Sequence, residues 1–176
     1  MLIVGLAPGL QGANRTGRPF TGDWAGDLLY ETLLRFGFAT GIYGERADDG
    51  LVLVDTAITN AVRCVPPRNK PTPAELATCR GFLSSTLAAM PRLKAVVSLG
   101  RISHESVLRA LGARLAAFPF AHGGVHRLAR GGGAPLALFE SYHCSRYNTN
   151  TRVLTPEMFR AVFANLRATL ATRAEA

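Results

Sequence analysis

Residues 136–148 read LALFESYHCSRYN, an apolar run that changes abruptly into polar residues. The run Leu136–Phe139 has the composition of a buried strand, and it leads directly into a loop that contains His143. The same layout occurs at the start of the chain, where Leu2–Val4 is followed by the glycine-rich loop GLAPGLQGANRTGRPFTGD at residues 5–23. In open parallel sheets, ligands bind in the crevice beyond the carboxyl ends of the strands. We therefore expect the two loops to form one cleft.

The rest of the chain alternates predicted strands and helices. Residues 23–36 carry apolar side chains at helical spacing and end at Gly37, which favours a helix. The sequence TPAE at residues 72–75 has the form of a capping box, and it predicts a helix that runs to about Met90. The remaining expected elements are one or two strands within 51–63, strands at Ala95–Leu99 and Val125–Leu128, and helices from about Ile102 to Leu111 and from Thr155 to about Thr172. This alternation predicts a mainly parallel sheet covered on both faces, in a single domain that spans residues 1–176.

The charge of the chain is dominated by arginine. The 176 residues include 20 Lys and Arg against 12 Asp and Glu, which gives a net charge of +8, and only Lys70 and Lys94 are lysines. Guanidinium groups bind phosphates in a bidentate manner, so this excess favours nucleic acid as a partner. The alternative is that a GC-rich genome simply prefers arginine codons.

The sequence shows no secretory signal and no apolar run that approaches the length of a membrane span. The three cysteines cannot all pair with one another. We therefore expect a monomeric cytoplasmic protein with reduced thiols and no membrane partner.

The glycine spacing of residues 5–23 excludes two common nucleotide-binding loops. It matches neither the G-x-G-x-x-G dinucleotide fingerprint nor the phosphate-binding loop that ends in Gly-Lys-Ser/Thr. The glycines still let backbone N–H groups approach a ligand closely. Phe20 is a candidate stacking platform for a planar base, with core packing as the alternative. Asp23 lies at the start of the predicted helix, where capping is the simpler interpretation.

Two polar residues stand out as candidates for chemistry. His143 lies at a strand end among hydroxyl, amide and guanidinium side chains, which makes it the strongest catalytic candidate. Asn60 lies inside the apolar segment AITNAV, and a buried amide must be hydrogen-bonded. It therefore either presents a donor and an acceptor to a base edge or pairs with a neighbouring loop.

Other histidine and cysteine chemistry is disfavoured. Cys144 follows His143, but neighbouring side chains of an extended segment point in opposite directions, which argues against a Cys–His nucleophile pair. His122 and His126 flank glycines, and no third ligand at a suitable spacing supports a zinc site.

Together these segments resemble the uracil-DNA glycosylases, and within that superfamily the type-b or family 5 branch. The resemblance rests on the loop at residues 5–23, ITNAVRC at 58–64, NKPTP at 69–73 and SYHCSRYN at 141–148, which span nearly the whole chain. It implies a three-layer α/β/α sandwich with a four-stranded, mainly parallel sheet. It also implies an enzyme that flips uracil, or another deaminated base, out of DNA and hydrolyses its bond to deoxyribose, leaving an abasic site.

The resemblance implies a base pocket formed by four residues. Asn60 matches the amide that reads the edge of uracil, and Phe20 matches the ring that stacks on it. Leu6 and Ala7 match positions beside the base. Ala7 stands where other branches of the superfamily carry a water-activating acidic or amide residue.

The resemblance also implies catalytic and DNA-binding roles. His143 matches the histidine that stabilises charge on the departing base, and the carboxylate of Asp23 is implied to help in place of the missing water activator, with Asn148 close by. The residues expected to contact DNA are Asn14, Arg15, Arg18, Ser145, Arg146 and Tyr147. Tyr147 is further expected to fill the gap left by the flipped base.

One departure from the family concerns its cofactor. Relatives usually hold a four-iron, four-sulfur cluster on four cysteines, two of them in a segment before the first strand. Cys64 and Cys79 match the later pair, whereas Met1 begins at the first strand. Because four thiolates are the usual requirement, we predict that the cluster is absent and that no metal is bound.

Two other functions remain open from the sequence. The chain could be a module that binds uracil-containing or ordinary DNA without releasing a base, because Ala7 leaves the water-activating position empty. It could also be a hydrolase of free nucleosides or nucleotides, although the arginine excess argues against a small free substrate.

Overall fold

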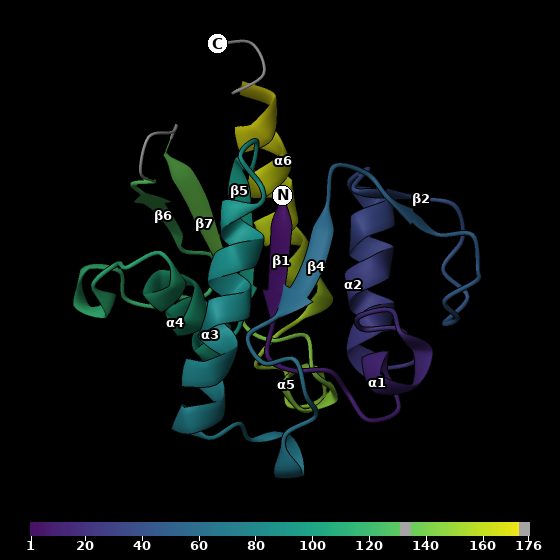
Figure 1. The fold of residues 1–176 in the computed structure, drawn as a ribbon. Coiled ribbons are helices and arrows are strands. Elements are labelled where there is room, and N and C mark those ends of the chain that lie inside the picture. Colours follow the sequence, from purple (N-terminus) through teal and green to yellow (C-terminus); the bar gives the residue numbers. More distant parts are fainter. Residues whose placement is uncertain (131–134, 173–176) are drawn as a thin grey trace.

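The computed structural model describes the whole chain except residues 131–134 and 173–176. Its centre is a five-stranded sheet in the order β4-β1-β5-β7-β6 (Figure 1). The strands are β1 (Leu2–Gly5), β4 (Ala57–Asn60), β5 (Ala95–Leu99), β6 (Val125–Leu128) and β7 (Leu136–Ser141). The first three and β7 run parallel, which confirms the predicted α/β class.

The sheet has one strand more than the four that the resemblance implies. The additional strand, β6, pairs antiparallel with β7 at the edge of the sheet. Residues 129–135, which connect the two, are too few for the crossover that a parallel pair requires.

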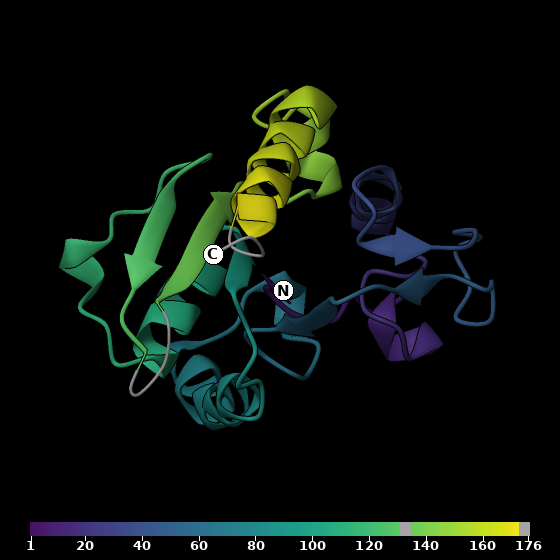
Figure 2. The same ribbon diagram turned by 90° about the horizontal axis from the view of Figure 1, so that it is seen from above.

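Helices cover both faces of the sheet, as Figure 2 shows. One face carries α2 (Trp24–Arg35) and α6 (Pro156–Thr172), and the other carries α3 (Pro73–Ala88) and α4 (Arg101–Ala110). The alternation of side chains along β1 divides the core accordingly, because Ile3 belongs to the α2–α6 side whereas Leu2 and Val4 belong to the α3–α4 side. The predicted capping box is present, since Thr72 Oγ1 accepts from the Glu75 N–H.

The predicted strand region 51–63 contains two strands that belong to different sheets. Val52–Leu53 (β3) pairs antiparallel with Ala39–Thr40 (β2) outside the main sheet, whereas β4 joins β1. The two polar loops expected to be irregular each contain a short helix, α1 (Ala13–Thr16) and α5 (Arg146–Asn150). Two single 3-10 turns, η1 (Pro67–Asn69) and η2 (Leu115–Ala117), complete the elements.

Strand β7 continues two residues beyond its predicted end at Phe139. The added residues, Glu140 and Ser141, are fully buried although they are polar. Glu140 has polar neighbours there, because its Oε2 accepts from the Ala121 N–H at 2.6 Å and its Oε1 lies 2.6 Å from His104 Nδ1 and 3.1 Å from His126 Nε2. The polar character of Glu140 and Ser141 therefore led to a predicted strand end that is two residues too early.

The carboxyl ends of the parallel strands point toward the edge of the sheet where α1, α5 and the η1 segment lie (Figure 1). Both polar loops of the sequence are therefore at the same end of the molecule. Within the described residues, no helix combines the length and the apolar character needed to cross a bilayer.

Candidate active site

Asn60 and Phe20 meet above the end of β1. The parallel register places Asn60 opposite Gly5. A Cβ atom on Gly5 would lie 2.4 Å from Asn60 Oδ1 and 2.6 Å from Phe20 Cζ, which is closer than Cβ contacts allow. Glycine at this position therefore lets the amide and the ring share one site.

Phe20 is held in this place by a constrained backbone. It is only 6% exposed, and its φ of +61° is one that non-glycine residues rarely adopt. Its carbonyl oxygen occupies the space in which a Cβ of Gly26 would lie, at 1.9 Å, and it accepts a hydrogen bond from Tyr43 Oη at 3.4 Å. A strained conformation of this kind, worth roughly 1–3 kcal/mol, persists only where the surroundings impose it.

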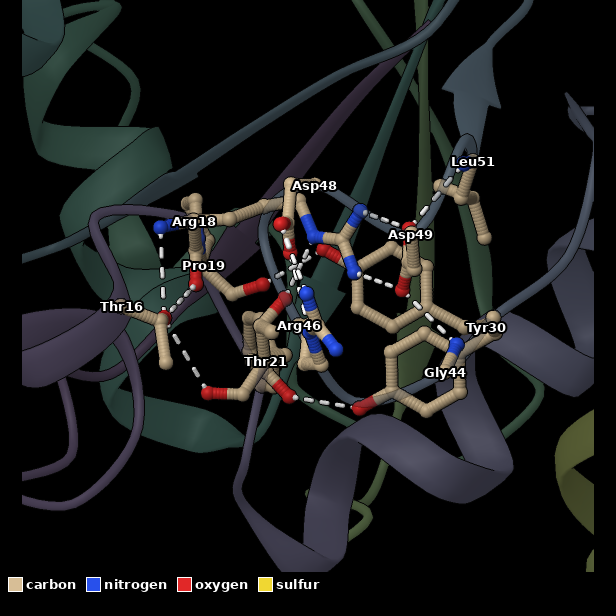
Figure 3. A network of polar contacts seen from close by, with 12 residues as sticks. Thr16, Arg18, Pro19, Thr21, Tyr30, Gly44, Arg46, Asp48, Asp49 and Leu51 are labelled. Carbon is tan, nitrogen blue, oxygen red and sulfur yellow. Dashed lines mark hydrogen bonds and ion pairs between the residues drawn. The ribbon is translucent and has the colours of Figure 1, made fainter.

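Arg18 and Thr21, which flank Phe20 in the sequence, belong to a network around a partly buried ion pair, shown in Figure 3. The two terminal nitrogens of Arg18 donate to the two oxygens of Asp49 at 2.8 and 2.6 Å, and its Nε donates to Thr21 Oγ1 at 2.6 Å. The Asp49 carboxylate also accepts from the backbone N–H groups of Gly44 and Leu51. The Arg18 guanidinium beside Asp49 holds the pKa of that carboxyl well below its usual range. We call this group of residues the Arg18–Asp49 centre.

His143 lies on the other side of Phe20, in the loop after β7. The centres of the two rings are 6.1 Å apart. The backbone of Gly100, which follows β5, passes close to the start of the His143 side chain, since a Cβ there would lie 3.6 Å from the Cβ of His143. Three strand ends therefore converge on this ring, as the cleft prediction requires.

A cavity of about 260 Å³ opens beside His143. Its lining residues are Leu6, Asn69, Leu99, Gly100, Arg101, Ile102, Ser103, His143 and Ser145. Its volume is below the roughly 300–1,000 Å³ of pockets for drug-sized ligands, so it suits a single small ring. Phe20 and Asn60 do not line this cavity themselves. Phe20 lies beside His143, which does line it, and Asn60 and Phe20 both lie against Gly5.

The unpaired polar atoms of the described residues point to this site. Buried side-chain atoms without a hydrogen bond are Asn60 Oδ1, His143 Nδ1, His104 Nδ1 and Glu140 Oε1. The last two face one another at 2.6 Å and form a His–Glu pair. Buried polar atoms are almost always satisfied, so the remaining two, on Asn60 and His143, indicate a missing ligand.

The environment of His143 keeps the imidazole neutral. Burial lowers the pKa of His143 to about 4, because desolvation disfavours the charged ring. The Asn148 side chain donates from Nδ2 to the carbonyl of His143 at 2.9 Å. His122 accepts from the Tyr142 N–H at 3.1 Å and stacks on its ring. The loop that contains His143 is therefore held by hydrogen bonds at the Tyr142 N–H and at the His143 carbonyl.

Asp23 does not cap the helix that it precedes. It is the N-cap residue of α2, yet its side chain makes no capping hydrogen bond. A Cβ on Gly9 or Gly12 would lie 2.4 or 1.9 Å from a carboxylate oxygen of Asp23, so the carboxylate rests against the glycine-rich loop. Burial raises the pKa of Asp23, because desolvation disfavours its charged form.

The surroundings of Cys144 disfavour a role as a nucleophile. The side chain is fully buried, and its Sγ contacts the carbonyl oxygen of Ala25 at 3.5 Å. Burial raises the pKa of the thiol to about 12, so the reactive thiolate is not formed at neutral pH.

The residues expected to contact DNA fall into two groups. Five of them belong to the two short helices at the carboxyl ends of the strands or cap one: Asn14 and Arg15 on α1, Ser145 at the N-cap of α5, and Arg146 and Tyr147 within α5 (Figure 1). Tyr147 is 74% exposed. Arg18 differs from these five, because each nitrogen of its guanidinium donates one hydrogen bond to Asp49 or Thr21. Its role in DNA binding stays a prediction.

The sequence did not lead us to expect residues 99–103 in the lining of the cavity, which we call its floor. The segment Leu99–Ser103 links β5 to α4 and supplies five lining residues, and Asn69 adds one from η1. The available signal was the buried strand Ala95–Leu99 followed by Gly100, which is a third strand end in the same crevice. Leu6 lines the cavity as expected, whereas Ala7 is not among the lining residues.

The cysteines matched to a metal cluster provide two ligands. Cys64 is exposed and Cys79 is partly exposed, and both are free thiols. Among the described residues, no group of three or more His, Cys, Asp or Glu side chains is placed to hold a metal ion. These two thiols are half of the set that a four-iron cluster needs, and the predicted absence of the cluster stays a prediction.

Comparisons with known proteins agree with the geometry. A family model described as the uracil DNA glycosylase superfamily matches residues 1–167. The chain is 46% identical to the type-5 uracil-DNA glycosylase of Thermus thermophilus over 162 residues, which cover 92% of this chain and 72% of that protein.

Two further relatives carry the same description. The type-5 uracil-DNA glycosylase of Pyrobaculum aerophilum is 40% identical over 96% of this chain and 71% of its own length. The type-5 uracil-DNA glycosylase of Mycobacterium bovis is 43% identical over 93% of this chain and 60% of its own length. All three relatives are longer than the matched region.

Proposed function

This chain belongs to the uracil-DNA glycosylase superfamily, and we propose that it removes uracil, and other deaminated bases that fit the pocket, from DNA. The reaction breaks the bond between C1′ of deoxyribose and N1 of the base, and water adds to C1′. The product is an abasic site. The observation that supports this assignment best is the pair of unpaired buried atoms, Asn60 Oδ1 and His143 Nδ1. His143 lies beside the ring of Phe20, and Asn60 and Phe20 both lie against Gly5.

The base must leave the duplex before it can reach this site. A base that is mispaired, as uracil is opposite guanine, costs less to extrude than a paired one. The ring of Phe20 is buried, and the Arg18–Asp49 centre holds the side chain of the neighbouring Thr21, so Phe20 offers a preformed surface for the flipped base to stack on. Preorganisation of this kind reduces the entropy lost on binding.

Asn60 distinguishes uracil from cytosine through its unpaired oxygen. Uracil carries an N3–H donor, which would satisfy Asn60 Oδ1, whereas N3 of cytosine has only a lone pair. Cytosine would therefore leave a buried acceptor opposite another acceptor. A site built around a polar partner rejects the analogue that lacks it strongly.

His143 stabilises the departing base. Cleavage leaves the bonding electron pair on N1, and the negative charge spreads to the oxygen O2. A neutral imidazole, as the lowered pKa of His143 implies, donates a hydrogen bond to this oxygen as the charge develops. The hydrogen bond from Asn148 to the His143 carbonyl fixes the position of the ring.

Asp23 acts on the sugar side. Cleavage builds positive charge on C1′, which a nearby carboxylate stabilises, and the same carboxylate can orient the attacking water. The rim of the cleft supplies the grip on the DNA backbone, from Asn14, Arg15, Ser145 and Arg146. Tyr147 occupies the gap in the stack.

The direct test is an excision panel. Single- and double-stranded oligonucleotides that carry uracil, hypoxanthine or no lesion are incubated with the protein, and base release is followed by alkaline cleavage at the abasic site. Release of free uracil supports the proposal. A mobility shift without cleavage would make the protein a DNA-binding module, and hydrolysis of free deoxyuridine alone would make it a nucleoside hydrolase.

A further inference from the structure

Trp24, the single tryptophan of the chain, is half-exposed beside the proposed active site. It is the first residue of α2 and follows Asp23 directly. Its Nε1 donates to Thr149 Oγ1 at 3.1 Å, and the guanidinium carbon of Arg146 lies 4.9 Å from the ring centre. Both partners belong to α5, whose N-cap Ser145 lines the cavity.

These contacts orient the indole without burying it. The edge is fixed by the hydrogen bond to Thr149 and one face is covered by Arg146, yet the residue remains 50% exposed. A large aromatic side chain that only stabilised the fold would gain more by being buried. The arrangement therefore keeps a flat apolar surface open to solvent and already oriented.

Exposure alone does not make a binding site, as a second cation–π pair in the same molecule shows. Phe82 on α3 is also 50% exposed, and Arg63 lies over its ring at 4.5 Å. Like Trp24, Phe82 lies on a helix that covers a face of the sheet, and neither residue lines the cavity. What distinguishes Trp24 is its place next to Asp23 and α5 at the rim of the cleft.

We propose that the indole of Trp24 stacks on a nucleobase of the bound DNA strand next to the flipped nucleotide, while Arg146 contacts the adjoining phosphate. An aromatic ring next to a cation is the pairing by which proteins bind single-stranded nucleic acid, because every base has a π-face and every nucleotide a phosphate. The net charge of +8 is complementary to this partner. The inference rests on the proposed DNA function and adds a binding subsite to it.

The first test uses the fluorescence of Trp24 itself. Because no other tryptophan is present, a change in indole emission on addition of a duplex with an abasic-site analogue reports on this residue alone. Stacking on a base is expected to quench the emission strongly and saturably. Unchanged emission at saturating DNA, with binding confirmed by a mobility shift, would overturn the proposal.

The second test compares variants in binding to the same duplex. Trp24→Ala is expected to weaken binding about tenfold, whereas Trp24→Phe, which keeps a ring, is expected to lose less than about threefold. Phe82→Ala is the matched control and is expected to bind like the unmodified protein. Equal binding by Trp24→Ala and Phe82→Ala would contradict the proposal.

Salt dependence separates stacking from charge. Trp24→Ala is expected to leave the dependence of binding on salt concentration unchanged, whereas Arg146→Gln is expected to reduce its logarithmic slope by about one. Uracil release by the unmodified protein is measured in parallel. If release is absent but quenching occurs, the proposed reaction fails and the subsite stands; the reverse result rejects the subsite alone.

Discussion

Two polar regions flank Phe20, and they differ in whether their hydrogen-bonding groups have partners. In the Arg18–Asp49 centre, each guanidinium nitrogen and both carboxylate oxygens have partners within the protein (Figure 3). On the other side, Asn60 Oδ1 and His143 Nδ1 are buried and have none. The first region is satisfied within the protein, and in the proposed function the flipped base supplies partners to the second.

Both regions contain charged or polar residues, but the first should contribute mainly to stability and the second mainly to function. A satisfied centre stabilises the native state, and removing one member leaves the other uncompensated. Unpaired buried polar atoms reduce the stability of the free protein, and a ligand that forms hydrogen bonds with them removes this cost. Variants in the two regions should therefore affect different measurements.

The largest effect is expected for His143→Ala. Loss of the donor to the departing base should lower the rate of uracil release by about 10²–10³-fold. The midpoint of thermal unfolding should change little, because Nδ1 makes no bond in the free protein. DNA binding should persist, and a variant that unfolds or fails to bind would contradict the proposed role.

Asp49→Ala is expected to act on stability. It leaves the Arg18 guanidinium, whose side chain is 16% exposed, without its ion-pair partner, and the free energy of unfolding should fall by about 3 kcal/mol. Denaturation by urea measures this change. The exposed pair Arg46–Asp48 provides the control, since water screens its charges and Asp48→Ala should leave stability nearly unchanged.

Asn60→Ala is expected to weaken discrimination. The ratio of excision rates for uracil and cytosine should fall by at least about tenfold, because the acceptor that requires an N3–H donor is gone. Competition between oligonucleotides that carry either base measures the ratio. An unchanged ratio would remove Asn60 from the recognition role.

The pH profile tests the charge state of His143. Because burial lowers its pKa to about 4, the ring is neutral throughout the range from about pH 6 to 8, and the rate should be flat there. The rate should fall to about half near pH 4, as the ring gains a proton. If the imidazolium were the active form, the rate would instead fall as the pH rises through about 6.5.

Cys144→Ala should have the smallest effect on chemistry. The thiol stays protonated at neutral pH, so uracil release should change less than about twofold. Single-turnover kinetics at neutral pH measures this change. A loss as large as that of His143→Ala would show that the thiol takes part in the reaction.

Much of the fold could be predicted from local patterns. The apolar runs of β5, β6 and β7, the helical spacing of α2 and the capping box of α3 are local, and the structure places elements there. The end of β7 was placed two residues too early, because Glu140 is buried by partners on other segments, namely His104 and Ala121. A pattern of polar and apolar residues cannot detect partners that are distant in the chain.

The candidate site was predictable to a similar degree. His143 stands out in the sequence at the end of an apolar run and Asn60 inside one, and both are among the described residues with an unpaired buried atom. Arg18 was predicted to contact DNA because it lies among polar loop residues, and the structure adds an ion pair with Asp49, 31 residues further on. Nothing near Arg18 in the sequence indicates that pairing.

The sequence by itself determined the alternation of strands and helices, the basic charge and the polar residues at strand ends, because each depends on neighbours along the chain. The tertiary structure alone decided which polar groups have partners, which way Asp23 and Trp24 face, and that Leu99–Ser103 forms the floor of the cavity. The physical reason is that hydrogen bonding and desolvation depend on distances in space. Residues far apart in the chain set those distances once the sheet brings its strand ends together.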